Sequence, residues 1–142
     1  MFDGKMKAVT FSYDDGTVQD VRLIEILNKY GLKATFNLNS EHLGRERRIT
    51  VDGVEVCHDK IKPEDVRRIY AGHEIASHTL THPRLPAIDD DAEVIRQVEE
   101  DRIKLSELAG ARFKERTNLF GTVACEDDGD RNGYYENEYH RL

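Results

Sequence analysis

Two histidines four residues apart, His78 and His82, are the side chains whose type and spacing most directly suggest chemistry. In a helix or turn, positions i and i+4 share a face, so both imidazoles can reach one ion. Neutral imidazole is a favoured ligand of zinc and related metals. Alone the pair is weak evidence, because such pairs also occur by chance on solvated helices. Pro83, directly after it, disfavours an exposed helix and favours a metal-binding role.

Two adjacent carboxylates, Asp14 and Asp15, follow an apolar run far upstream of the histidines. Like charges at contact distance raise a pKa, so the pair is costly unless one carboxylate binds a cation or shares a proton. The alternative is an acidic turn in which Gly16 relieves the backbone. Two histidines and one carboxylate would form a three-ligand metal site with an open position for water, and the second carboxylate would be free to act as a base.

The segments around these residues predict an α/β fold that brings them together. A helix is expected over residues 18–27, between caps at Thr17 and Gly31. Loops converge at the carboxyl ends of parallel strands, so the carboxylates and the histidines should share one face of a sheet. Three short runs rich in β-branched and aromatic residues predict the strands: 7–13, 33–39 and 73–77.

Three further elements complete the expected fold. Asp52-Gly53 lies between two β-rich runs and predicts a hairpin over residues 48–58. Pro63 should open a short helix that ends near residue 70. A long acidic helix is expected over residues 89–110. Its expected buried stripe consists of apolar residues: Val94, Ile95, Val98, Ile103, Leu105 and Leu108.

The run Thr10-Phe-Ser-Tyr-Asp-Asp-Gly16 resembles the first motif of the polysaccharide deacetylases, the carbohydrate esterases of family four, and His78-Thr-Leu-Thr-His82 resembles the second. The resemblance covers about residues 7–110. It implies a distorted (β/α) barrel fold. It also implies an enzyme that removes N- or O-acetyl groups from a carbohydrate with the help of one divalent metal ion. Zinc is the preferred ion, with cobalt, nickel or iron as alternatives. The resemblance further implies that Asp14 is the general base and that Asp15, His78 and His82 bind the metal.

The chain departs from the family pattern beyond the long helix. The third motif should fall at residues 118–122, but Asn118 and Leu119 stand where relatives have tyrosine and proline. His140 lies too close to that motif to be the general acid, so we interpret it as a tail residue without a role. We expect one domain over 1–142 with a divergent tail from about residue 111. The barrel should therefore be incomplete at its C-terminus, and its open sheet edge predicts a homodimer.

Composition narrows the classes of partner. A net charge of −7 and no basic stripe argue against nucleic acid. The sequence has neither a long apolar run nor a secretory signal, which predicts no membrane partner and a cytoplasmic location. Cys57 and Cys125 are expected to be free thiols, with a single long-range disulfide as the alternative, and His73 is expected to be a packed or hydrogen-bonded residue. Two alternatives to the deacetylase stay open: an impaired carbohydrate-binding or scaffold protein that keeps the metal site, and a metal-dependent hydrolase of other small amides.

Overall fold

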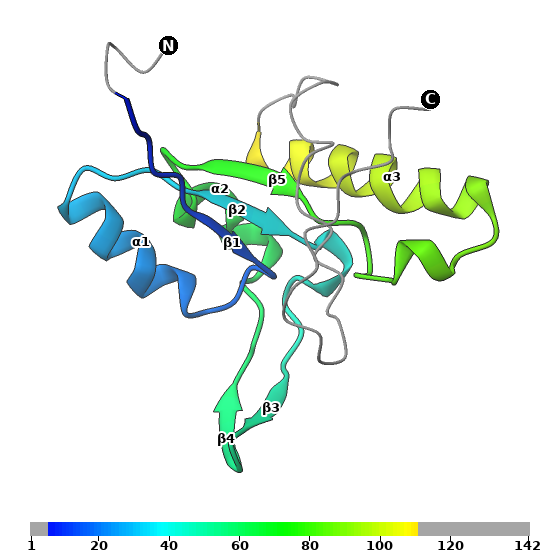
Figure 1. Ribbon diagram of the computed structural model, residues 1–142, viewed down its shortest axis with the longest axis horizontal. Helices are drawn as coiled ribbons and strands as arrows, with labels where there is room; N and C mark the ends of the chain where they lie inside the picture. Colours follow the sequence, from blue (N-terminus) through cyan, green and yellow to red (C-terminus); the bar gives the residue numbers. More distant parts are fainter. Residues whose placement is uncertain (1–5, 111–142) are drawn as a thin grey trace.

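The centre of the protein is a parallel sheet of three short strands: β1 (Ser12–Asp14), β2 (Thr35–Leu38) and β5 (Glu74–Ser77). The structure is a computed structural model and describes residues 6–110 of the 142-residue chain. The strand order is β1-β2-β5, so β2 is central and both neighbours run parallel to it (Figure 1). The predicted α/β fold is confirmed and each predicted run contains a strand, although β1 begins only at Ser12 and extends to Asp14, one residue beyond its predicted run.

Helix α1 (Asp20–Lys29) makes the crossover from β1 to β2. It buries Ile24 and Leu27 against the sheet, as the helical spacing predicts. The predicted cap at Thr17 is wrong, because the N-cap is Gln19, which makes no side-chain cap bond. Gly31 has the left-handed φ of 67° expected just past a helix end.

The predicted hairpin is confirmed as β3 (Arg48–Val51) paired antiparallel with β4 (Val54–Cys57). Asp52 and Gly53 both have positive φ, 50° and 78°, which a two-residue type I′ turn requires. The hairpin projects away from the parallel sheet (Figure 1). Its base therefore lies near the sheet, while its tip is exposed.

The remaining helical segments are short, apart from one long helix. A 3₁₀ turn, η3 (Pro63–Asp65), opens on proline as predicted and leads into α2 (Val66–Ile69). The long helix α3 (Asp91–Ala109) begins at the N-cap Asp90 and ends at Gly110, whose φ is 65°. Two more 3₁₀ turns, η2 (Ser40–His42) and η4 (Leu85–Ala87), lie in the loops after β2 and β5.

The apolar stripe expected on α3 is only partly correct. Ile95 and Ile103 are 56% and 47% exposed, whereas the buried positions are Gln97, Asp101 and Leu105. These three residues are spaced four apart and share one face of the helix. Two of them are polar because this face meets loops whose backbone N–H groups need acceptors.

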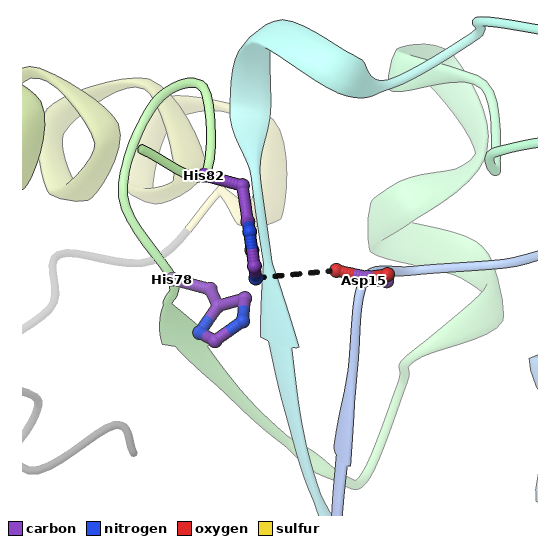
Figure 2. Close-up of side chains that lie close together, drawn as sticks. All are labelled: Asp15, His78 and His82. Carbon is purple, nitrogen blue, oxygen red and sulfur yellow. Dashed lines mark ion pairs between the residues drawn. The ribbon is translucent and has the colours of Figure 1, made fainter. Parts of the chain in front are cut away.

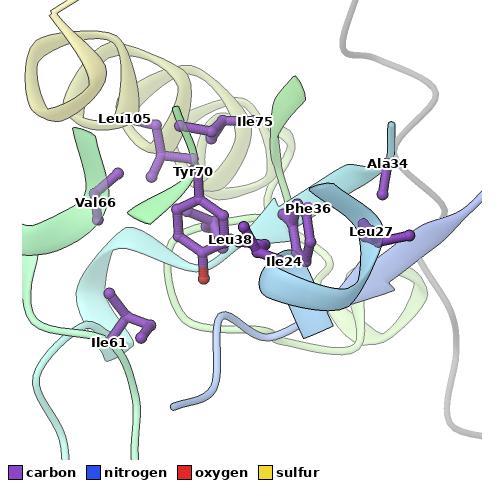
Figure 3. Close-up of a cluster of buried hydrophobic side chains, with 10 residues drawn as sticks. All are labelled: Ile24, Leu27, Ala34, Phe36, Leu38, Ile61, Val66, Tyr70, Ile75 and Leu105. Atoms are coloured by element: carbon purple, nitrogen blue, oxygen red, sulfur yellow. The ribbon is translucent and has the colours of Figure 1, made fainter. Parts of the chain in front are cut away.

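The apolar core lies between the sheet and the helices (Figure 3). Phe36 and Leu38 of β2 are completely buried at its centre, and Tyr70 stacks at an angle against Phe36. The other buried members come from α1, α2, α3, β5 and the segments before β2 and after β4: Ile24, Leu27, Ala34, Ile61, Val66, Ile75 and Leu105. The core thereby holds β1 and β5, whose ends carry the acidic pair and the histidines, in fixed positions on β2.

Three predictions, about the barrel, the homodimer and the membrane, have different outcomes in this structure. A closed barrel is not shown, since the parallel sheet of residues 6–110 has three strands. The homodimer stays a prediction. No helix in this part of the chain combines the length and apolar character needed to cross a bilayer.

Asp20, at the start of α1, makes stability depend on pH. Burial raises the pKa of its carboxyl to about 6, although the Tyr70 hydroxyl donates a hydrogen bond of 2.7 Å to Oδ2. A raised pKa means that the folded state is favoured below the unfolded value of 3.8 and loses that advantage as pH rises through about 6. We expect wild type to lose about 3 kcal/mol of unfolding free energy from this group between acid and neutral pH.

Asp20→Asn should lack this pH-dependent loss of unfolding free energy, because asparagine accepts the hydrogen bond from Tyr70 without ionising. Urea unfolding of both proteins at several pH values, in the presence of a chelator, measures the difference. Asp52→Asn, in the exposed hairpin turn, is the control that should follow the wild-type profile. Parallel profiles for wild type and Asp20→Asn would contradict the prediction.

Candidate metal centre

The acidic pair lies where β1 ends in a sharp turn. Asp15 has a left-handed φ of 78° and Gly16 one of 60°. A Cβ on Gly16 would come within 2.8 Å of the buried Leu38 Cδ2, so glycine is required by both conformation and space. This turn breaks the alternation of side chains along the strand, and so Asp14 and Asp15 can both lie at the same end of the sheet.

The histidines lie on the turn that follows β5. Thr79 and His82 have left-handed φ angles of 69° and 54°, so the segment is a turn and not a helix. The buried Asn39 fixes this turn, because its Nδ2 donates to the carbonyl oxygens of His78 and Thr79. The two imidazole rings consequently lie edge to face with centroids 4.7 Å apart.

Asp15, His78 and His82 gather at one point, as expected from the carboxyl ends of β1 and β5 (Figure 2). One potential ligand atom from each residue lies within 4.8 Å of the other two. Asp15 Oδ1 is 3.9 Å from His82 Nε2. One carboxylate and two imidazoles form a donor set that binds zinc and related divalent ions, with positions left over for water or substrate.

His78 provides a test of whether these residues fit a metal. Its side chain is buried, and neither ring nitrogen has a hydrogen-bond partner among residues 6–110. A buried polar atom without a partner costs about 1–3 kcal/mol, which an ion bound to the ring would offset. Burial also lowers the pKa of His78, which favours the neutral imidazole that ligates metals. The residues present therefore fit a metal ion.

Asp15 is shared between the histidines and two basic residues that sequence reasoning missed. Its second oxygen, Oδ2, lies 3.3 Å from Lys60 Nζ and 3.9 Å from His58 Nε2. Burial acts to raise the pKa of Asp15, but the Lys60 ammonium and the two site histidines outweigh it, and the pKa lies below its usual value. Asp15 is thus ionised at neutral pH, as a metal ligand must be.

Lys60 reaches Asp15 because the chain returns from the hairpin alongside the acidic turn. Ile61 N–H donates to the Gly16 carbonyl at 2.9 Å, and Thr17 forms an isolated antiparallel bridge with Lys60. No local motif marks this pairing. The only signal in the sequence is a lysine placed shortly after a predicted hairpin.

Asp14 lies beside the metal centre in the exposed end of β1. It is opposite Asn37 in the parallel register, and Asn37 Nδ2 donates to Asp14 Oδ1 at 2.6 Å. The same amide nitrogen lies 2.8 Å from Ser12 Oγ. Asn37 is 1% exposed, so a rigid group orients a carboxylate that solvent and a ligand can reach.

The polar face of α3 supports the histidine turn from behind. Asp101 is completely buried and accepts three hydrogen bonds, from Ser77 Oγ (2.6 Å), His78 N (3.1 Å) and Ser40 N (2.7 Å). Gln97 accepts from Thr81 N at 3.1 Å through its side chain. These two residues position the turn that carries both histidines. The apolar periodicity of α3 gave no sign of them.

A comparison with protein families identifies the chain. The model of the polysaccharide deacetylase family matches residues 3–119, which is most of the sequence. The chain belongs to the polysaccharide deacetylase family. Its match includes both segments that form the site, the acidic turn after β1 and the histidine turn after β5.

Solved structures of polysaccharide deacetylases and carbohydrate esterases have a similar fold. The Bc1960 peptidoglycan N-acetylglucosamine deacetylase is 25% identical, with a TM-score of 0.54 over 72% of this chain and 42% of that one. The chitin deacetylase of Colletotrichum lindemuthianum is 26% identical, with a TM-score of 0.52 over 71% and 40%. The family 4 carbohydrate esterase of Streptomyces lividans is 20% identical, with a TM-score of 0.55 over 75% and 48%. The chain spans less than half the length of each.

The other candidate residues have simpler outcomes. His73 is hydrogen-bonded, as expected: its Nδ1 accepts from Ala34 N at 3.3 Å, and its ring packs edge-on against Phe36. Cys57 forms no disulfide within residues 6–110, the part of the chain that the structure describes. The divergent third motif at 118–122, His140 and Cys125 lie outside the described residues.

Proposed function

We propose that this polysaccharide deacetylase family member removes N- or O-acetyl groups from a carbohydrate by metal-assisted hydrolysis. The observation that carries the proposal is the gathering of Asp15, His78 and His82 at one end of the sheet, with Asp14 beside them. The family supports a carbohydrate as the acyl carrier. Two relatives are named as deacetylases of peptidoglycan N-acetylglucosamine and of chitin.

Each of the three gathered residues would hold the ion. A divalent metal bound there supplies Lewis acidity toward an acetyl carbonyl and lowers the pKa of a bound water. The lowered pKa values of His78 and Asp15 keep the first neutral and the second ionised, so both offer lone pairs and not protons. By donor type we propose zinc first, with cobalt, nickel or iron as alternatives.

Asp14 is the proposed general base. Its carboxylate would take a proton from the attacking water, and the Asn37 amide, 2.6 Å from Oδ1, holds it in one orientation while the second oxygen can face the substrate. A base fixed by a buried neighbour loses less freedom when substrate binds, which favours proton transfer.

Acetate release tests the proposal. The full-length chain loaded with metal should release acetate from an N-acetylated chito-oligosaccharide or an acetylated xylan fragment, and a chelator should abolish the release. Asp14→Asn should lower the rate by about 100-fold or more, because general-base catalysis typically contributes at least that factor. Asp52→Asn, in the hairpin turn remote from the sheet, should keep the wild-type rate.

Other results would select the alternatives. A chain that binds both an ion and the oligosaccharide yet releases no acetate would favour a carbohydrate-binding or scaffold protein. Acetate released from small N-acetyl amides but not from carbohydrates would favour a hydrolase of another substrate class. Equal rates for wild type and Asp14→Asn would remove Asp14 as the base.

A further inference from the structure

A cavity of about 370 Å³ opens next to the metal centre on the side of the hairpin. Asp15 and His82 line one wall, so the cavity and the site share two residues. The remaining lining residues come from η2, the hairpin and its base, and the histidine turn: His42, Arg47, Ile49, His58, Lys60 and Thr81. No motif of the sequence and none of the proposed catalytic roles accounts for this wall.

The lining is positively charged although the chain as a whole is acidic. The chain carries a net charge of −7, yet the cavity is lined by two basic side chains, Arg47 and Lys60, and by a single carboxylate, Asp15. That carboxylate offsets only one of the two cations. In the metal-free chain the cavity therefore has one positive charge in excess, which suits a singly charged anion.

Arg47 is positioned on the cavity with its guanidinium available. Its backbone is fixed at the base of the hairpin, because its N–H donates to Asp59 Oδ1 at 2.9 Å and its carbonyl accepts from His58 N at 2.8 Å. Its guanidinium makes no ion pair with another residue of the range 6–110, whereas that of the next residue, Arg48, is held 3.0 Å from Asp59. A guanidinium presents a planar fork of donors that matches a carboxylate.

Lys60 adds a second donor from inside the cavity. It is 5% exposed, and its only ion-pair partner in the described part of the chain is Asp15, at 3.3 Å. An ammonium has three N–H donors, so one carboxylate oxygen leaves capacity for a second anion. Arg47 at the exposed mouth and Lys60 in the buried wall therefore flank the space beside Asp15.

We propose that this cavity receives a carboxylate carried by the sugar whose acetyl group is removed, held by Arg47 and Lys60. The inference rests on the proposed function and narrows its substrate class from neutral to acidic acetylated sugars. A carboxylate fits better than a phosphate, because the excess charge of the metal-free lining is one and a phosphate monoester carries more.

Binding to the metal-free full-length chain tests the subsite, because a chelator removes any contact between a carboxylate and the ion. N-acetylmuramic acid and N-acetylglucosamine differ by one lactyl carboxylate, and the methyl ester of the former is a neutral control of equal size. In an NMR titration we expect N-acetylmuramic acid to bind roughly fivefold to tenfold more tightly than either neutral sugar, as one charge-assisted contact provides. Added salt should reduce this advantage.

Two neighbouring arginines give a matched pair of variants. Arg47→Gln should remove the preference for the acidic sugar, while Arg48→Gln, whose partner is Asp59, should keep it. Equal binding of acidic and neutral sugars by wild type would overturn the proposal, and so would an equal loss in both variants. Tighter binding of N-acetylglucosamine 6-phosphate than of N-acetylmuramic acid would overturn the choice of a carboxylate.

Acetate release by the metal-loaded chain, measured beside this binding, separates the inference from the proposed function. If no substrate releases acetate but the acidic sugar binds through Arg47, the proposed hydrolysis fails and the subsite stands. If acetate is released equally from acidic and neutral substrates and binding shows no preference, the hydrolysis stands and the subsite fails.

Discussion

Alanine at both His78 and His82 is expected to lower the affinity for a divalent ion by far more than 100-fold. The two imidazoles are two of the three donors that gather at the site, and only Asp15 would remain. Even residues that merely support a metal ligand contribute about 10–100-fold to affinity, so loss of two ligands should exceed that range. Elemental analysis after dialysis against a weak chelator measures the bound ion in each protein.

The control is a histidine close in sequence that takes no part in the site. His73 accepts from Ala34 N and packs on Phe36, so His73→Ala should cost stability but leave metal binding intact. Retention of one ion per chain by the double variant would remove the basis of the metal centre and of the proposed hydrolysis with it. Loss of the ion from His73→Ala alone would mean that metal binding reports on folding and not on these two ligands.

Asp101→Ala is expected to destabilise the fold by about 3 kcal/mol or more and to weaken metal binding as well. The substitution removes the acceptor of three hydrogen bonds, and each buried donor left without a partner costs about 1–3 kcal/mol. One of these donors is the backbone N–H of His78, so the histidine turn should lose its support along with β5. Urea unfolding and metal titration measure the two effects separately.

Two companion variants of α3 sharpen this prediction. Burial raises the pKa of Asp101, which shows that its charge is costly in this position. Asp101→Asn removes that cost while keeping one acceptor oxygen, so it should be less harmful than alanine. The neighbouring Glu100 is exposed, and Glu100→Ala should change the unfolding free energy by less than about 0.5 kcal/mol. An Asp101→Ala protein as stable as wild type would show that the buried network does not support the site.

The three residues of the candidate metal centre could be predicted from the sequence, because one general rule of parallel sheets brings them together. Asp15 directly follows β1 and His78 directly follows β5, and the carboxyl ends of parallel strands meet at one edge. The hairpin is predictable for a similar reason, since Asp52-Gly53 satisfies a local backbone requirement that few sequences meet. In both cases the deciding information lies within a few residues of the feature.

Asp101 and Lys60 were not predictable, because what decides their role lies far away in the sequence. Apolar periodicity treats a polar residue on a helix as exposed, and it therefore assigned the buried face of α3 to Ile95 and Ile103. Burial of Asp101 is favourable only because Ser40, Ser77 and His78 supply three donors from other segments. This pairing of one buried carboxylate with donors from distant segments exists only in the assembled fold, so no local sequence pattern indicates it.

The left-handed backbone at Asp15 and His82 limits which amino acids either position can accept. Residues other than glycine rarely adopt this conformation, and aspartate, asparagine and histidine are the types that tolerate it best. Glycine would relax the backbone but remove the ligand, and asparagine would suit the backbone but carry no charge for an ion. Cysteine and glutamate would supply a ligand atom without this tolerance. Aspartate and histidine satisfy both requirements at once, so substitution at these two positions is restricted even before any reaction is considered.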